Sequence, residues 1–133
     1  FNVMDKTKIS SAALEKALKS LNKAVLQPKN EFTRDSVIQR FEFTFELCWK
    51  LLQKVLSSDK PLEDLSVKGI LREAAKLGFI QDLNLWLKFQ EARNLTSHTY
   101  NEDTAKEVFE IAVRLPKEAE TLITHIKKAL QQK

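Results

Sequence analysis

Glycine, proline and cysteine are scarce in this chain. Its 133 residues include two glycines, three prolines and one cysteine. So few chain breakers leave little room for the turns of a many-stranded sheet, and helix-forming residues dominate. The single Cys48 excludes an internal disulfide, and because it lies in an apolar helical stretch we expect a small buried side chain rather than a nucleophile. The sequence predicts an all-α fold.

Long apolar runs are also absent. No run of 18 apolar residues occurs, and the basic N-terminus is not followed by an apolar secretory core. We therefore expect no membrane span, no signal peptide and a cytoplasmic protein. The length and the 43% apolar content suit one domain over residues 1–133. Because the chain begins with Phe1 rather than Met, we expect residues 1–8 to be a flexible lead or a remnant of processing or cloning.

Metal-ligand spacing and the usual nucleotide motifs are not found either. His98 and His125 lie far apart, and Glu42 and Glu46 lack the Glu-x-x-His companions of a di-iron bundle. There is no glycine-rich phosphate loop, nucleophile elbow or dinucleotide fingerprint. We therefore expect no metal site and no cofactor in this chain. By itself it contains no recognisable nucleotidyltransferase active site.

Excess positive charge is confined to the N-terminal end. The first 30 residues carry six lysines against two acidic residues, whereas basic and acidic residues balance in the remainder. A basic first helix could lie along a phosphate backbone or an acidic partner. A solvated lysine-rich face is the alternative.

Apolar residues recur at helical spacing in three N-terminal segments. The first helix should cover about residues 9–26, the second about 34–57 with Thr33 as its N-cap, and the third about 66–77, ended by Gly78. The second segment has the richest apolar pattern and should pack against two or more neighbours. Its inward face consists of Val37, Phe41, Phe45, Cys48, Leu52 and Val55.

The C-terminal half continues the pattern. Asp82 should cap a fourth helix that turns Trp86 and Phe89 inward, and Asn101 should open the last helix. That helix has a sustained heptad seam, and Pro116 predicts either a kink or two consecutive helices. The whole is predicted to be an antiparallel up-and-down bundle of four long helices plus a short one.

Several residues fall outside these inward faces. Phe43 and Leu47 lie opposite the core face of their helix, one turn apart. A second outward stripe of mixed character suits a self-complementary dimer contact. Its members are Leu83, Leu87, Asn94 and His98. Phe43, Leu47, Leu83 and Leu87 are therefore candidate partner or dimer contacts.

Residues 93–100 concentrate the chemistry-bearing side chains. Arg93 leans toward an apolar face and needs a partner, which an ion pair with Glu42 or Glu46 could supply. His98 could be a helix cap or a proton-transfer group. Together with a supporting polar role for Asn94, Arg93 and His98 meet the needs of metal-independent phosphoryl chemistry on RNA. A shared site within one chain requires the helix to end near Ser97; otherwise two chains must build it.

Residues 40–50, Trp86 and residues 93–100 resemble the nucleotidyltransferase substrate-binding protein family. This family is a branch of the HEPN superfamily (higher eukaryotes and prokaryotes nucleotide-binding) that includes HepT-like toxins. The resemblance rests on the segment RFEFTFELCWK and on the spacing Arg-polar-x-x-x-His-x-Tyr, and it covers most of the chain.

The resemblance implies a dimeric, HEPN-like helical bundle whose gene lies beside that of a small, separate nucleotidyltransferase. That partner would use ATP or another nucleoside triphosphate with Mg²⁺, and this chain would be the substrate-binding subunit of a toxin–antitoxin-like pair. In related toxins the arginine and the histidine form a ribonuclease site, silenced by adenylylation of the motif tyrosine. These roles would fall on Arg93, His98 and Tyr100, with RNA or a nucleotide as a possible ligand.

Overall fold

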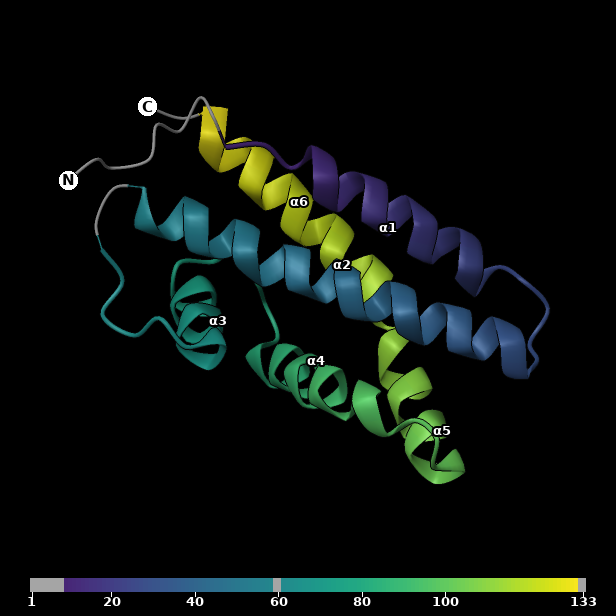
Figure 1. The fold of residues 1–133 in the computed structure, drawn as a ribbon. Helices are drawn as coiled ribbons and strands as arrows, with labels where there is room; N and C mark the ends of the chain where they lie inside the picture. Colours follow the sequence, from purple (N-terminus) through teal and green to yellow (C-terminus); the bar gives the residue numbers. More distant parts are fainter. Residues whose placement is uncertain (1–8, 59–60, 132–133) are drawn as a thin grey trace.

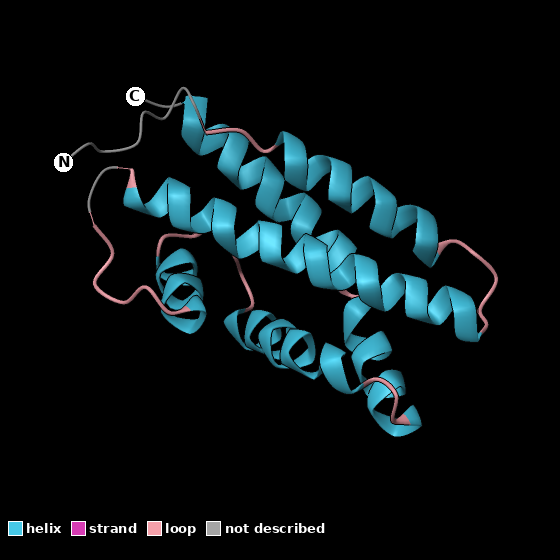
Figure 2. Cartoon of the chain, viewed as in Figure 1, coloured by secondary structure: helices cyan, strands magenta, loops and turns pink. Residues whose placement is uncertain are grey.

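The computed structural model describes residues 9–58 and 61–131, and these ranges contain helices and no strands (Figures 1 and 2). The elements are α1 (Ala12–Val25), α2 (Glu31–Ser57), α3 (Val67–Lys76), α4 (Leu83–Leu95), the 3-10 turn η2 (Thr96–His98), α5 (Glu102–Ala112) and α6 (Leu115–Gln131). The predicted all-α bundle is confirmed. The lead expected at residues 1–8 lies outside the described residues. None of the helices described is both long and apolar enough to cross a membrane.

The 27-residue helix α2 is the central element of the bundle. In Figure 1, α1 and α6 lie along one side of α2, whereas α3, α4 and α5 lie along the other. Each of these five helices packs against α2. This arrangement agrees with the rich apolar pattern of residues 34–57, which predicts several neighbours.

The predicted inward face of α2 is buried along its whole length. At its middle, Phe41 and Phe45 meet Trp86 and Phe89 of α4, and all four side chains are almost completely buried. The Trp86 and Phe89 rings pack edge to face with centroids 5.1 Å apart, and Phe41 and Phe89 do so at 6.2 Å. Edge-to-face pairs add to the stabilisation from area burial. This aromatic cluster fixes α4 against α2.

Cys48 belongs to the same core and is fully buried, as its sequence context predicts. Burial raises the pKa of its thiol, because the apolar surroundings disfavour the thiolate. The thiol is thus neutral and inert in the folded chain.

The start of α2 differs from the prediction. The predicted N-cap, Thr33, is wrong: Asn30 caps the helix, and its Oδ1 accepts hydrogen bonds from the backbone N–H groups of Phe32 (2.9 Å) and Thr33 (3.0 Å). Thr33 Oγ1 in turn accepts from the backbone N–H of Asn30 at 2.9 Å, which completes a capping box. The helix therefore starts three residues earlier than predicted, at Glu31.

The end of the chain forms two consecutive helices, one of the two alternatives predicted from Pro116. α5 ends at Ala112 and α6 begins at Leu115, so Pro116 is in the first turn of α6. At that position the missing N–H has no intrahelical acceptor to lose. Gly78 also behaves as predicted: it follows α3 with a φ of 86°, in the left-handed region where a glycine is unstrained.

Candidate functional site

The candidate site lies at the junction between α4 and α5. Asp82 caps the start of α4, and Asn101 caps the start of α5 by accepting a hydrogen bond from the backbone N–H of Thr104 at 3.1 Å. Both caps were predicted. Between the two helices, α4 gives way to the 3-10 turn at Thr96, so the α-helical geometry does not continue to His98.

Arg93 is held against α2 by two glutamates. Its Nε donates a hydrogen bond to Glu46 Oε1 at 2.6 Å, and its Nη1 lies 3.6 Å from Glu42 Oε2. About a third of the Arg93 side chain is exposed. The ion pair considered from the sequence is therefore present, and it uses both glutamates rather than one. Two carboxylates face one guanidinium, which leaves this part of the site with excess negative charge.

Thr96 extends the same cluster. Its Oγ1 lies 2.7 Å from the Arg93 carbonyl oxygen and 3.2 Å from Glu42 Oε2, and its single proton can serve one of them at a time. Thr99 Oγ1 donates to the Thr96 carbonyl oxygen at 3.2 Å. These contacts fix the 3-10 turn against α2.

His98 and Tyr100 are exposed on the outer side of the junction. The backbone of His98 is fixed, since its carbonyl oxygen accepts a hydrogen bond from the Asn101 N–H at 3.2 Å. The Tyr100 side chain is 87% exposed, and its ring lies edge-on to the His98 ring with centroids 6.1 Å apart. Asn94 is also exposed. Within the described chain, no hydrogen bond or ion pair joins the side chains of Arg93 and His98.

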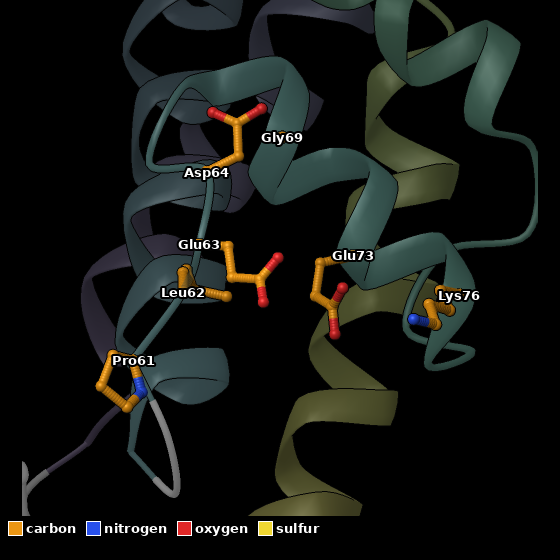
Figure 3. Close-up of a pocket in the computed structure, with 7 residues that line it drawn as sticks. All are labelled: Pro61, Leu62, Glu63, Asp64, Gly69, Glu73 and Lys76. Carbon is orange, nitrogen blue, oxygen red and sulfur yellow. The ribbon is translucent and has the colours of Figure 1, made fainter.

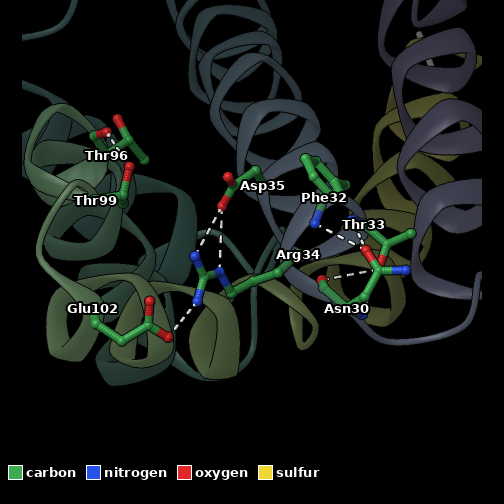
Figure 4. A network of polar contacts seen from close by, with 8 residues as sticks. All are labelled: Asn30, Phe32, Thr33, Arg34, Asp35, Thr96, Thr99 and Glu102. Atoms are coloured by element: carbon green, nitrogen blue, oxygen red, sulfur yellow. Dashed lines mark hydrogen bonds and ion pairs between the residues drawn. The ribbon is translucent and has the colours of Figure 1, made fainter.

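A second ion pair, near the N-terminus of α2, joins α2 to the start of α5. Arg34 Nη1 lies 2.6 Å from Glu102 Oε2 in the first turn of α5, and Arg34 also contacts Asp35 at 3.3 Å (Figure 4). The sequence reasoning missed this pair, because its members are 68 positions apart and each looks like an ordinary surface charge. The pair borders a cleft of about 380 Å³ between α2 and α5.

The predicted contact residues differ in exposure. Phe43 is 40% exposed. Leu47, Leu83 and Leu87 are half-buried and pack against the core cluster. Their part in a partner or dimer contact stays a prediction.

A different cavity, of about 250 Å³, lies between α3 and the segment before it (Figure 3). Glu63, Asp64 and Glu73 line it. Asp64 is already engaged, because its Oδ1 accepts a hydrogen bond from the backbone N–H of Ser66 at 2.9 Å and its side chain packs against Gly69. No group of three or more His, Cys, Asp or Glu side chains that could hold a metal is found in residues 9–58 and 61–131.

Comparison with known proteins gives a consistent result. The family described as "nucleotidyltransferase substrate binding protein like" matches residues 10–128. The chain belongs to this family. The match covers α1 to α5 and most of α6, including the α4–α5 junction, so the resemblance carried by residues 40–50 and 93–100 is confirmed.

Three relatives of this family member are informative. A probable ribonuclease HepT of Haemophilus influenzae is 34% identical, with 77% of this chain and 81% of that protein covered. A crystal structure from Thermus thermophilus has a TM-score of 0.78 and 38% identity, covering 86% of this chain and 98% of that chain. A Haemophilus influenzae structure described as the fold of a substrate-binding domain of a nucleotidyltransferase has a TM-score of 0.77 and 29% identity, covering 92% and 100%. The chain thus has the substrate-binding fold of this family.

Proposed function

We propose that this chain is a HEPN-type substrate-binding subunit that pairs with a separate small nucleotidyltransferase, encoded nearby, in a cytoplasmic toxin–antitoxin-like system. The observation that carries the proposal is the exposure of Tyr100. Its side chain is 87% exposed at a junction whose backbone is fixed by the Asn101 cap. A partner's active site can therefore reach the phenol without unfolding this chain.

The surroundings of Tyr100 suit nucleotidyl transfer by a partner that supplies ATP and Mg²⁺. In such a step the Tyr100 oxygen attacks the α-phosphorus of ATP, the bond to the β-phosphate oxygen breaks, and pyrophosphate leaves. The phenol must lose its proton, and in this proposal the exposed imidazole of His98, whose ring lies edge-on to that of Tyr100 with centroids 6.1 Å apart, receives it. The family membership of the chain and its lack of a recognisable nucleotidyltransferase motif support a separate partner.

Pairing is tested by titrating the purified chain with the purified nucleotidyltransferase in a calorimeter. We expect saturable binding that weakens at least tenfold in a Tyr100→Glu variant, because a charge would enter the contact. Lys128→Glu, on α6, is the matched control and should bind like the wild type. Equal affinity of all three chains would show that the contact does not include the junction.

A second candidate function is a metal-independent ribonuclease that acts through Arg93 and His98, with Asn94 in support. Two observations favour it: the exposed His98, and the similarity to a protein named a probable ribonuclease. A histidine can remove the proton from a ribose 2′-hydroxyl, whose oxygen then attacks the adjacent phosphate and releases the 5′-oxygen. Arg93 would stabilise the charge that develops on the phosphate.

Arg93 limits this second function within one chain. Its Nε and Nη1 already face Glu46 and Glu42, so an RNA phosphate must either displace those carboxylates or use the remaining Nη2. A homodimer that places His98 of one copy near Arg93 of the other would satisfy the chemistry, and we propose such a dimer. Light scattering gives the mass directly: twice the chain mass supports the dimer, and the mass of one chain contradicts it.

Ribonuclease activity is tested by RNA cleavage in EDTA, which removes contaminating metal-dependent nucleases. Cleavage that is lost in both Arg93→Ala and His98→Ala, and after pre-treatment with the partner and ATP, would support the ribonuclease. Cleavage that survives in both variants would exclude Arg93 and His98 as its catalytic residues. No cleavage, alongside tight pairing, would leave the binding subunit as the function.

A further inference from the structure

The outer surface of α1 and α2 has an unusual distribution of charge. Five lysines are exposed there, three on the side of α1 opposite its buried leucines and two on α2. We call this surface the α1–α2 basic face. Its cations are Lys16, Lys19, Lys23, Lys50 and Lys54.

Among the described residues, the acidic side chains of α1 and of residues 36–57 of α2 contact groups other than these lysines. In α1 the single acidic residue, Glu15, accepts from Lys127 Nζ of α6 at 2.9 Å and from Ser11 Oγ at 2.7 Å. Along residues 36–57 of α2 the acidic residues are Glu42 and Glu46, and both contact Arg93 of α4, although Glu46 also lies one turn before Lys50. Within residues 9–58 and 61–131, none of the five lysines forms an ion pair.

The basic face is also apolar at its centre. A cavity of about 270 Å³ lies between the start of α1 and the C-terminal half of α2. Ala13, Leu14, Leu47 and Leu51 give it an apolar lining, and Lys50 and Lys54 stand at its edge. Half-buried Trp49 lines the same cavity, and Phe43, 40% exposed, is one turn before Leu47 on α2. Within residues 9–58 and 61–131, no carboxylate lines it.

We propose that the α1–α2 basic face binds an acidic amphipathic helix of a partner protein. The apolar side of such a helix would place one large side chain in the cavity over Leu47, and its carboxylates would meet Lys50 and Lys54 on α2 and Lys16 on α1. Helices recognise grooves in this way, with apolar anchors at i, i+3 or i+4 and i+7. Complementary charge would set the orientation and raise the association rate.

The lining favours a protein over a nucleic acid. Aliphatic surface is offered by Leu47, Leu51 and Ala13. Such surface stabilises a buried apolar side chain by about 25 cal/mol per Å², but it provides neither a charge nor a hydrogen-bond donor to a phosphate. On α2, Lys50 and Lys54 lie one and two turns beyond Glu46, so the face begins beside the glutamates that hold Arg93 and extends to the cavity between α1 and α2. The proposal uses none of Arg93, His98 and Tyr100, so its failure would leave the pairing and cleavage tests unaffected.

The test is a selection of displayed random 16-residue peptides on the full chain, with counter-selection on a Lys50→Glu/Lys54→Glu variant. We expect the enriched peptides to carry net negative charge and apolar residues at helical spacing. Synthetic copies should bind at least about tenfold more weakly to the double variant. They should bind with unchanged affinity to Lys106→Glu/Lys128→Glu, which makes the same charge change on α5 and α6.

Two results would overturn the proposal. The first is a set of enriched peptides without charge bias, or peptides that bind the double variant as well as the wild type. The second is a poly-uridine oligonucleotide that competes fully with the peptides and depends on the same lysines, which would make the face a phosphate-binding surface. Thermal melting of each variant verifies folding. A Phe43→Ser variant removes an exposed apolar side chain without changing the charge, and it too should bind the enriched peptides more weakly than the wild type.

Discussion

The coupling between Arg93 and Glu46 is open to direct measurement. Their 2.6 Å contact joins side chains that are 32% and 26% exposed, so the pair lies between a solvated surface ion pair and a buried one. Exposed pairs contribute roughly 0.2–1 kcal/mol, and hydrogen bonds to charged groups about 1.5–3 kcal/mol. We therefore expect a coupling free energy of about 1–2 kcal/mol. Glu42, at 3.6 Å and 40% exposed, should couple to Arg93 by less than about 1 kcal/mol.

The assay is a double-mutant cycle of Arg93→Met and Glu46→Gln, followed by urea unfolding at pH 7. These changes keep most of each side chain's shape and remove its charge. Arg93→Met should cost more than Glu46→Gln, since it leaves Glu42 and Glu46 as like charges one turn apart. Glu46→Gln should then recover part of that loss in the double variant. A cycle of Lys88→Met, exposed on α4, with Glu46→Gln is the control and should be additive. A coupling below about 0.3 kcal/mol would refute the view that this pair holds the site in place.

Three further outcomes follow from individual contacts. His98→Ala should change the free energy of unfolding by less than about 0.5 kcal/mol, because the ring is exposed; a loss of several kcal/mol in urea would point to a buried structural role instead. Cys48 should react with Ellman's reagent only after denaturation, even at pH 9, because burial raises the pKa of its thiol; rapid reaction of the native chain would contradict the packing of α2. Asn30→Ala should cost about 1 kcal/mol in thermal or urea unfolding through loss of the α2 cap, and an unchanged stability would show that Thr33 caps the helix after all.

Much of the fold could be predicted because the signals are local. Apolar spacing gives the helices and the inward face of α2, and the caps at Asp82 and Asn101 are marked by residues whose side chains accept from the first turn. The start of α2 was misplaced for a local reason too. Asn30 and Thr33 are both good N-cap residues, and the choice between them depends on how the capping box closes, which spacing alone does not determine.

The site was less predictable because its geometry depends on contacts distant in sequence. The partners of Arg93 were anticipated as alternatives, yet nothing in the sequence indicates that both glutamates are used. The 3-10 turn at residues 96–98 depends on Thr96 reaching back to the Arg93 carbonyl oxygen and across to Glu42. The Arg34–Glu102 pair forms only once α5 packs beside α2.

The measurement that most directly tests the central claim is peptide mapping by mass spectrometry after incubation with the partner nucleotidyltransferase, ATP and Mg²⁺. The proposed function predicts one adenylyl group, located on Tyr100, and none on a Tyr100→Phe variant. It also predicts that His98→Ala slows the modification without abolishing it, because the imidazole assists only the proton transfer. No adduct on the wild-type chain, or an adduct that persists at another residue in Tyr100→Phe, would contradict it.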